Sequence, residues 1–593
     1  MLSTLAVVAV VGSLASQQPE TGVSAEAAAW VKAHAVPLKT CEAGNGFEDL
    51  AGLKDVVGKA RIVSLGEPTH GTREAFQLKH RLLEYLATEM GFRVFSIEAN
   101  MPESYNLNEY VLEGKGDPRK LIGGMYFWTW NTEEVLAMVE WMKTFNEAGR
   151  AREGASFVPL RFTGFDMQTP DVAATVAIDG VRAIDPALAD EMVALYGKLP
   201  EIQRQAAGQG NGDGTGIMVG SFPPDAAKGK KVRVSAWIKT KDVGTFAGWW
   251  FRCDKPDQSV GAFNNMADFG PKGTTDWKRY EFTLDVPADT VNINFGPLIV
   301  GSGEAWFDDI EIELDGVVYS DPAKFSFDFE NPAVLYLTAT TPGTKASRVK
   351  EGVHGGTTCL YVGALIGKEP ENKVDPAEVE AKTDELLTRL KGMRGALAAK
   401  HGETQAEWII QNARVVSQCA SMLAAGNMMG GAVRDESMAT NVKWILDQDP
   451  AAKIVLWAHN GHVSRAEAYG QEWMGAHLTT MFPGQSVVFG FATGSGRYTA
   501  MAPGEGLKSD NQLLEPPAGS VEAHMASVGA PVLMLDLRGA AAAGSAAAWI
   551  ASPTQMRSIG ALATPQQFYP QNLAESYDVL LYIAESTASR TLR

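Results

Sequence analysis

The sequence predicts an α/β protein in which a parallel-sheet domain is interrupted by an antiparallel β-sandwich. Near-continuous runs of Val, Ile, Leu and Phe alternate with helical patterns toward both ends of the chain, as in strands that are buried on both faces of a parallel sheet. Between these regions the helical period disappears, and apolar and polar residues alternate between Gly, Pro and Asp turns. A chain of 593 residues also exceeds one ordinary core, so we expect more than one domain.

The changes of pattern divide the chain into four segments. They are a signal peptide at 1–16, a first part of the α/β domain at 25–204, an inserted sandwich at 205–362 and a second part of the α/β domain at 363–593. The opening "MLSTLAVVAVVGSLAS" has the length of a signal-peptide core and is too short to span a bilayer, although no Lys or Arg precedes it. We therefore expect an exported protein, periplasmic or extracellular, without a membrane span.

Composition narrows the class of partner. The net charge of -18 argues against nucleic acid and against an anionic membrane surface, because little of the chain would neutralise phosphates. None of the four cysteines lies in a C-x-x-C pair, so a zinc-thiolate site is not expected. Free buried thiols are the expectation, and a bridge between Cys253 and Cys359 is the alternative.

The first part of the α/β domain opens with a strand, a turn and a helix. "RIVSL" is the strand, "GEPTHGT" is the turn, and "FRVFSIE" is the next strand after a helix that ends near Gly91. Helical spacing between them is carried by Phe76, Leu82, Leu83, Leu86 and Met90. Further buried strands are "PLRFTGFD", "KIVLWAHN", "SVVFGFA", "PVLMLDLR" and "DVLLYIA", and a long helical stretch runs from about Asp375 to Ala424.

Ionisable residues gather where these predicted strands end. They are Glu67, His70, Glu98, Asp166, His459 and His462. Ligands of an open parallel sheet sit beyond the carboxyl ends of its strands, so we expect these side chains to converge on one site. A structural role is the alternative for each: Glu98 or Asp166 alone could cap a helix, and Glu74 and Lys79 could belong to a solvated helix face.

The residue types suit hydrolysis of an ester by water. An imidazole can take a proton from water, and a neighbouring carboxylate, here Glu67 beside His70, raises its basicity and fixes its tautomer. The oxyanion that forms needs a donor, for which the candidates are His459, His462, Lys79 and Arg434. No G-x-S-x-G elbow supports a serine nucleophile. A divalent metal held by the same histidines and Glu67 is the competing reading, but the spacing lacks the i, i+4 pair of a zincin helix, and we expect neither metal nor cofactor.

Five segments together resemble the erythromycin esterase family. They are "SLGEPTHGTREAF", "GFRVFSIEAN", "GFD", "RDESMATN" and "AHNGHV", in the family's order and spacing. The resemblance implies a metal-free hydrolase of carboxylic esters or lactones, macrolides among them, with His70 as general base beside Glu67. It also implies that Glu74, Glu98, His459 and His462 line the catalytic cleft and that Lys79, Asp166 and Arg434 bind substrate.

One position departs from the family pattern. Macrolide-cleaving members carry an arginine where this chain has Lys79, and lysine lacks the planar fork of a guanidinium. The substrate is therefore expected to be a small ester or lactone without a commitment to macrolides. The remaining alternatives are a metal-dependent hydrolase that uses the same residues and an exported glycan-binding protein without turnover.

The central segment resembles the carbohydrate-binding-module type of jelly roll, also called galactose-binding-like. The resemblance rests on "DWKRYEFTLDVP" and "GSGEAWFDDIEIE", and "FSFDFENP" follows the "FDD" strand instead of opening the module, which implies a circular permutation. A carbohydrate is thus a possible partner. Trp249, Trp250 and Trp306 could stack on sugar rings, or they could belong to the sandwich core.

Overall fold

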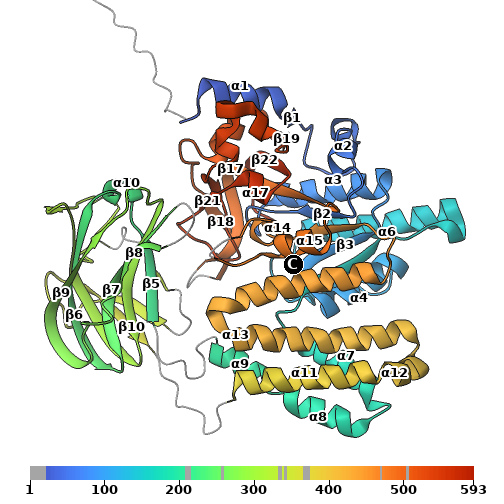
Figure 1. Ribbon diagram of the computed structural model, residues 1–593, viewed down its shortest axis with the longest axis horizontal. Coiled ribbons are helices and arrows are strands. Elements are labelled where there is room, and N and C mark those ends of the chain that lie inside the picture. Colours follow the sequence, from blue (N-terminus) through green and yellow to red (C-terminus); the bar gives the residue numbers. More distant parts are fainter. Residues whose placement is uncertain are drawn as a thin grey trace, which may run out of the picture.

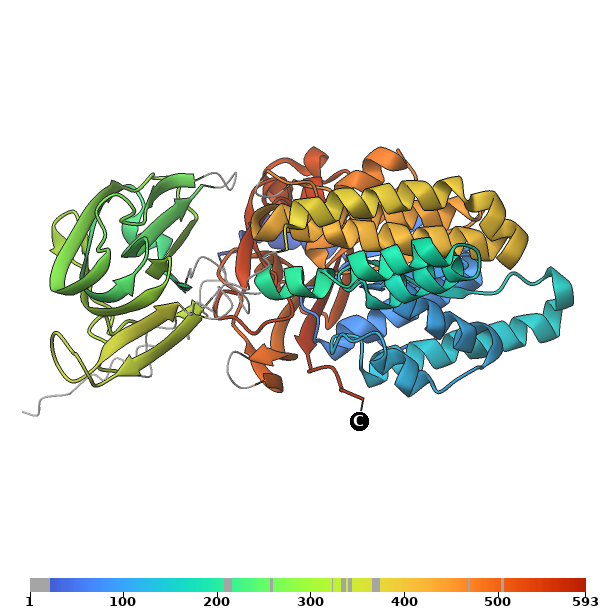
Figure 2. The ribbon, with the colours of Figure 1, turned by 90° about the horizontal axis from the view of Figure 1, so that it is seen from below.

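A computed structural model describes residues 22–206, 216–255, 260–322, 324–331, 337–339, 344–364, 374–467, 470–502 and 506–592. The signal peptide predicted at 1–16 lies outside these residues. Two bodies lie side by side along the long axis of the molecule, an α/β body and a pair of antiparallel sheets (Figures 1 and 2). No described helix is long and apolar enough to cross a membrane.

A nine-stranded sheet forms the centre of the α/β body, in the order β1-β19-β22-β17-β2-β16-β3-β4, with β18 paired to β17. The strands are β1 (Val36–Pro37), β2 (Ile62–Leu65), β3 (Val94–Asn100), β4 (Arg161–Asp166), β16 (Ile454–Trp457), β17 (Ser486–Ala502), β18 (Gly506–Leu513), β19 (Val532–Asp536) and β22 (Val579–Ser586). The pairs that join β22, β17, β2, β16, β3 and β4 are all parallel. The carboxyl ends of β2, β3, β4 and β16 therefore meet at one edge.

The expectation of a parallel sheet is wrong at one side. β19, which contains the predicted strand "PVLMLDLR", runs antiparallel to β22, and β1 and β18 also pair antiparallel. The reason lies in burial, because the first four of the five residues of β19 are buried. A strand covered on both faces is apolar whichever way it runs, so its sequence carries no signal of direction.

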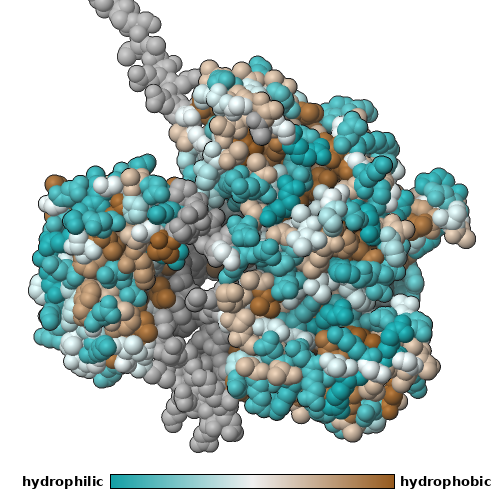
Figure 3. Space-filling view, in the orientation of Figure 1, coloured by the Kyte–Doolittle hydropathy of each residue, from teal (hydrophilic) through white to brown (hydrophobic). Residues whose placement is uncertain are grey.

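Helices cover both faces of this sheet, and successive strand residues point into two different cores. Ile454 and Leu456 join one hydrophobic cluster, and Val455 and Trp457 join the other. The first face is covered by α1 (Ala25–His34), α7 (Asp171–Arg182), α8 (Pro186–Tyr196), α11 (Pro376–Gly392), α12 (Arg394–His401), α13 (Glu403–Asp447) and α15 (Met474–Met481). The second face is covered by α2 (Leu53–Val57), α3 (Arg73–Glu89) and α6 (Glu133–Glu153). The outward sides of these helices are largely hydrophilic on the face seen in Figure 3, as expected for amphipathic helices.

Shorter helices complete the α/β body. They are η1 (Glu48–Leu50), α4 (Met101–Glu113), α5 (Pro118–Gly123), η2 (Gly154–Ser156), α9 (Leu199–Ala206), α14 (Asn460–Val463), α16 (Val521–Ala526), η3 (Ala540–Ile550) and α17 (Leu573–Ser576). The predicted helical stretch from Asp375 is α11, α12 and the beginning of α13. α13 continues beyond the predicted end through a kink at Gly426, where φ is 68°. This continuation carries the "RDESMATN" motif to the edge of the sheet.

Residues 216–364 contain the two antiparallel sheets, one of five strands (β13-β5-β10-β7-β8) and one of six (β14-β15-β11-β6-β9, with β12 on β11). The strands are β5 (Gly216–Ser221), β6 (Lys231–Val243), β7 (Phe246–Asp254), β8 (Val260–Asn264), β9 (Gly273–Asp285), β10 (Asn292–Val300), β11 (Gly303–Leu314), β12 (Val317–Val318), β13 (Thr338–Ala339), β14 (Thr344–Val349) and β15 (Cys359–Ala364), beside the short helix α10 (Pro224–Ala227). One hydrophobic cluster joins the two sheets. Trp249 is buried in this cluster and Trp250 in a smaller one with Phe246 and Leu298, so neither is free to stack on a sugar, whereas Trp306 packs against Tyr361. All four cysteines are free and buried, as expected.

Candidate active site

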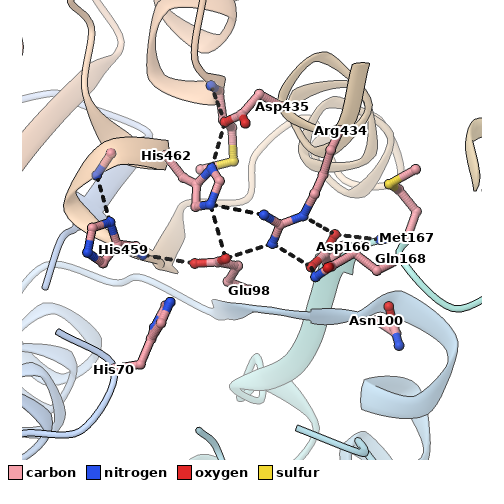
Figure 4. A network of polar contacts seen from close by, with 12 residues as sticks. His70, Glu98, Asn100, Asp166, Met167, Gln168, Arg434, Asp435, His459 and His462 are labelled. Carbon is pink, nitrogen blue, oxygen red and sulfur yellow. Dashed lines mark hydrogen bonds and ion pairs between the residues drawn. The ribbon is translucent and has the colours of Figure 1, made fainter. Parts of the chain in front are cut away.

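The predicted residues meet at the carboxyl edge of the sheet, and Figure 4 shows how most of them lie. Glu67 and His70 follow β2, Glu98 lies two residues before the end of β3, and Asp166 ends β4. His459 precedes α14 and His462 belongs to it. Arg434 reaches them from α13. The carboxylate of Glu74 instead accepts hydrogen bonds from the backbone and hydroxyl of Thr587, at 2.6 and 2.7 Å, and within the described residues no hydrogen bond or ion pair joins it to the other predicted site residues.

The turn after β2 is held closely against its neighbours. A Cβ atom on Gly66 would lie 2.2 Å from Oδ1 of Asn460, and one on Gly71 would lie 1.9 Å from the carbonyl oxygen of Thr499. No side chain fits at either position. The two glycines of "GEPTHG" therefore fix both ends of the turn that carries Glu67 and His70.

A buried carboxylate orients His70. Oε1 of Glu67 accepts a hydrogen bond from Nδ1 of His70 at 2.6 Å, and Oε2 accepts hydrogen bonds from Lys79 at 2.6 Å and from the indole of Trp457 at 2.7 Å. Burial would raise the pKa of Glu67, but the charge of Lys79 and the bond to His70 outweigh it and hold the pKa below its usual range. The bond to a carboxylate places the ring proton on Nδ1. Nε2 of His70, which has no hydrogen-bond partner among the described residues, is then the basic nitrogen.

Lys79 lies beneath this pair and has no exposed side-chain surface. Its ammonium group also lies 4.4 Å from the ring centroid of Trp457 and 5.5 Å from that of Phe491. Burial lowers the pKa of Lys79 to about 8, although the charge of Glu67 opposes the shift. The expectation that Lys79 binds substrate therefore does not match its position, because a fully buried ammonium group serves Glu67 instead.

His459 places a free N–H group beside His70. The centroids of the two rings are 5.2 Å apart. Nδ1 of His459 accepts a hydrogen bond from the backbone of Gly461 at 3.1 Å, so the neutral ring carries its proton on Nε2, which is buried and has no hydrogen-bond partner among the described residues. Burial, followed by the charges of His70 and His462, lowers the pKa of His459 to about 3. His459 is thus a neutral donor at working pH.

A second buried network supports His459. Glu98 accepts a hydrogen bond from the backbone N–H of His459 at 2.9 Å and from Arg434 at 2.7 Å. Arg434 also forms a two-point contact with Asp166, at 3.1 and 2.8 Å. Burial would raise the pKa of Glu98, but His462 and Arg434 hold it well below its usual range. The guanidinium is occupied by carboxylates, so its contribution to the site is chiefly to hold Glu98 and Asp166 in place.

His462 completes this second network. Nδ1 of His462 lies 2.8 Å from Asp435 and Nε2 lies 3.2 Å from Glu98. Burial opposes protonation, yet Asp435 and Glu98 raise the pKa of His462 to about 10. The ring is therefore cationic at neutral pH, donates a hydrogen bond to Asp435 and forms an ion pair with Glu98. Nη1 of Arg434, 3.0 Å from the same Nε2, then lies beside His462 without donating to it.

Two functional residues were missed by sequence reasoning. Asp435 anchors His462 and also accepts a hydrogen bond from the backbone of Met474 at 2.9 Å. In the sequence, Asp435 is indicated only by its place next to Arg434 in the motif "RDESMATN". Trp457 ends β16. A tryptophan in a strand predicted to be buried indicates a polar partner nearby, because a buried indole N–H usually forms a hydrogen bond.

The geometry also bears on the metal alternative. In the part of the chain that the structure describes, the group of side chains spaced to hold a metal ion is Asp308, Asp309 and His354, in the antiparallel sheets. The predicted active-site histidines do not form such a group with Glu67. Both oxygens of Glu67 are instead taken by hydrogen bonds from His70, Lys79 and Trp457.

A cavity of about 830 Å³ opens beside His459 and His462. Its far wall is formed by α17 and by a two-stranded hairpin, β20 (Thr554–Arg557) with β21 (Phe568–Gln571). Backbone pairing of Thr69 with Ile559 ties the end of this hairpin to the turn that carries His70. The volume is that of a site for a small organic molecule.

Comparison with known proteins identifies the family. The model of the erythromycin esterase family matches residues 87–223 and 358–586, more than half of the chain, and the chain belongs to this family. The matched segments contain Glu98, Asp166, Arg434, His459 and His462, and the first of them begins after His70. The interruption between them falls within the two antiparallel sheets.

Individual relatives match over shorter stretches. A putative hydrolase, YbfO of Bacillus subtilis (strain 168), is 34% identical over 162 residues, which are 27% of this chain and 34% of that protein. Erythromycin esterase type II of Escherichia coli is 28% identical over 140 residues, 22% of this chain and 33% of that protein. The chain thus spans about a third of the length of these relatives.

Two solved structures share the fold. A Bacillus cereus protein has a TM-score of 0.58 at 19% identity, with 96% of this chain and 99% of that chain covered. A succinoglycan biosynthesis protein also has a TM-score of 0.58 at 19% identity, with 95% and 98% covered. The family model and these relatives therefore agree on an erythromycin-esterase-like protein.

Proposed function

We propose that this chain hydrolyses carboxylic esters or lactones and that His70 activates the attacking water without a metal ion. The observation that carries the proposal is the bond of 2.6 Å between Glu67 and Nδ1 of His70. It leaves Nε2 of His70 as an unengaged base next to His459. A base fixed in one tautomer beside a neutral donor is what water attack on a carbonyl requires.

The reaction follows from these two nitrogens. Nε2 of His70 takes a proton from water while the water oxygen bonds to the carbonyl carbon. The imidazolium that forms is stabilised by the ionised Glu67, and the tetrahedral oxyanion accepts a hydrogen bond from Nε2 of His459. His70 then returns its proton to the departing alkoxide as the C–O bond breaks. The products are a carboxylic acid and an alcohol, or one hydroxy acid from a lactone.

The substrate is proposed to be a small molecule that fits the cavity of about 830 Å³. The name of the Escherichia coli relative supports macrolide lactones as candidates. Glu74 is assigned no part in this chemistry, because its carboxylate is bonded to Thr587. We further propose that the protein is exported and that residues 205–362 form an inserted jelly roll of the carbohydrate-binding type. Of the three tryptophans named for sugar stacking, only Trp306 retains that role, because Trp249 and Trp250 are buried.

The test compares wild type with His70→Ala on p-nitrophenyl acetate, a simple lactone and erythromycin, with and without a chelator. General base catalysis is typically worth about 10²- to 10⁴-fold, so at least about a 10²-fold loss is expected, with no effect of chelation. His34→Ala is the matched control, because His34 is exposed and stacks on Trp30. Near wild-type turnover by His70→Ala would overturn the mechanism. Abolition by the chelator with rescue by zinc would establish the metal-dependent alternative.

A further inference from the structure

The β20–β21 hairpin lines a cavity on each of its two sides. Met556 and Arg557 line the large cavity beside the active-site histidines. Gln555 and Phe568 line a separate small cavity of about 40 Å³, whose opposite wall is formed by residues of the antiparallel domain (residues 216–364), among them Val291. Tyr569 and Pro570 line both cavities. The hairpin therefore faces the large cavity on one side and the antiparallel domain on the other. Figure 1 shows β21 at the side of the α/β body that faces the antiparallel sheets.

A hydrogen-bonded line connects the antiparallel domain to this hairpin. The hydroxyl group of Ser221, the last residue of β5, donates to Oε1 of Gln566 at 3.2 Å. The side-chain amide nitrogen, Nε2, of the same Gln566 donates to the backbone carbonyl oxygen of Phe568 at 2.6 Å. Phe568 begins β21. The hydrogen bond from Ser221 thus helps to position the backbone of β21, the strand that contains Tyr569 and Pro570.

The other edge of the hairpin is anchored to the main sheet. Arg557 is fully buried and donates to the carbonyl oxygens of Thr493 at 3.1 Å and Gly494 at 2.7 Å, both in β17. It also donates to the side chain of Gln567, the neighbour of Gln566 in the chain. The rigid sheet therefore fixes one strand of the hairpin, and the contact with the antiparallel domain positions the other.

We infer that the antiparallel domain selects substrates for the cavity by positioning its hairpin wall through Ser221, Gln566 and the shared residues Tyr569 and Pro570. The inference rests on the proposed function, which assigns the cavity to the substrate. The antiparallel domain has its own hydrophobic cluster and so carries its contact surface as a unit. A displacement at that surface moves β21 and so changes the width of the cavity; Ile559, which pairs with Thr69 in the turn of His70, follows the strand that Arg557 anchors to the main sheet. The expected signature is a change in KM for bulky esters and little change in kcat for a small one.

The test uses three full-length variants. Val291→Trp places an indole where only about 40 Å³ is free, so it should press the antiparallel domain and the hairpin apart. Gln566→Ala removes the hydrogen bonds to Ser221 and Phe568 without adding bulk between the two parts. Val318→Trp is the matched control, because Val318 is 53% exposed on β12 of the other sheet. Thermal unfolding confirms that each variant is folded.

Amide hydrogen exchange of residues 554–571 is measured first, because it needs no substrate. Loss of one hydrogen bond corresponds to about a two- to tenfold faster exchange for Gln566→Ala, and Val291→Trp should exceed it. KM and kcat are then measured with p-nitrophenyl acetate and p-nitrophenyl decanoate. The expected result is a changed KM for the decanoate only. Exchange equal to that of Val318→Trp, or equal changes with both esters, would overturn the inference. Faster exchange in a protein that cleaves neither ester would refute the proposed function and leave the coupling standing.

Discussion

Lys79→Met tests whether the buried ammonium group beside Glu67 keeps that carboxylate ionised in the proposed catalytic pair of Glu67 and His70. The substitution keeps the length of the side chain and removes its charge. Both partners of the ion pair are fully buried and their atoms are 2.6 Å apart. Two unit charges about 4 Å apart interact by about 4 kcal/mol at an effective dielectric constant of 20, and breaking a buried pair costs about 3–5 kcal/mol. We therefore expect the free energy of unfolding to fall by about 3–5 kcal/mol.

The pH dependence of that loss has a definite sign. In wild type the pKa of Glu67 is held low, chiefly by Lys79 acting against burial. A depressed carboxylate pKa contributes stability above the unfolded value, about 4.3, that is lost as pH falls. Without Lys79 burial dominates and the pKa of Glu67 rises, so the variant can protonate Glu67 instead of burying an unpaired charge. The deficit relative to wild type should shrink from about pH 7.5 to about pH 5.

The assay is urea unfolding at both pH values, together with rates on p-nitrophenyl acetate. Lys54→Met is the matched control, because Lys54 forms an ion pair of 2.9 Å with Glu89 in which the side chains are 54% and 39% exposed. An exposed pair is worth about 0–1 kcal/mol. The double variant Lys79→Met with Glu67→Gln should recover part of the lost stability and none of the activity. A loss for Lys79→Met no larger than that for Lys54→Met would refute the reasoning.

Three further predictions follow from single contacts. Trp457→Phe removes one hydrogen-bond donor to Glu67 and should lower the free energy of unfolding by about 1–3 kcal/mol. Its kcat should also fall, by more than any change in KM. Gly71→Ala should lower the unfolding temperature by several degrees, because its Cβ would meet the carbonyl oxygen of Thr499 at 1.9 Å; Gly52→Ala is the control, because a Cβ there has no atom within 4 Å and φ is -64°. The pKa of His462 is raised to about 10, so its contribution to stability is complete below about pH 6.5 and is lost as pH rises through 10; the difference in unfolding free energy between wild type and His462→Gln should shrink over that range.

Much of the strand order along the chain could be predicted from the sequence, because buried strands are continuous apolar runs between turns. The direction of β19 could not, since burial on both faces erases the pattern that distinguishes directions. The kink at Gly426 also went unseen. A glycine within a helical pattern indicates a break only when the packing beyond it is known.

The site, like the fold, was predictable from the sequence only in part. The spacing of Glu67 and His70 after a strand predicts their contact, and the structure has it at 2.6 Å. The position of Lys79 was misjudged, although its signal was available. Lys79 falls at helical spacing between Phe76 and Leu83, on the apolar stripe of α3, and all three are buried. A lysine on a buried stripe needs an anion, and sequence alone does not show which one.

The arrangement of charge gives a reason for the many ionisable groups around the two imidazoles of the proposed reaction. Glu67 with Lys79 lies on one face of the sheet, where Trp457 packs into one core. Glu98 with Arg434 and His462 lies toward the opposite face, beneath α13. Each anion is met by a buried cation, so neither Glu67 nor Glu98 must draw a proton onto His459, whose pKa stays near 3. His459 thereby remains a neutral donor while His70 faces an ionised Glu67. Removal of either cation should therefore affect the two histidines differently, and that contrast separates a catalytic pair from a cluster that only stabilises the fold.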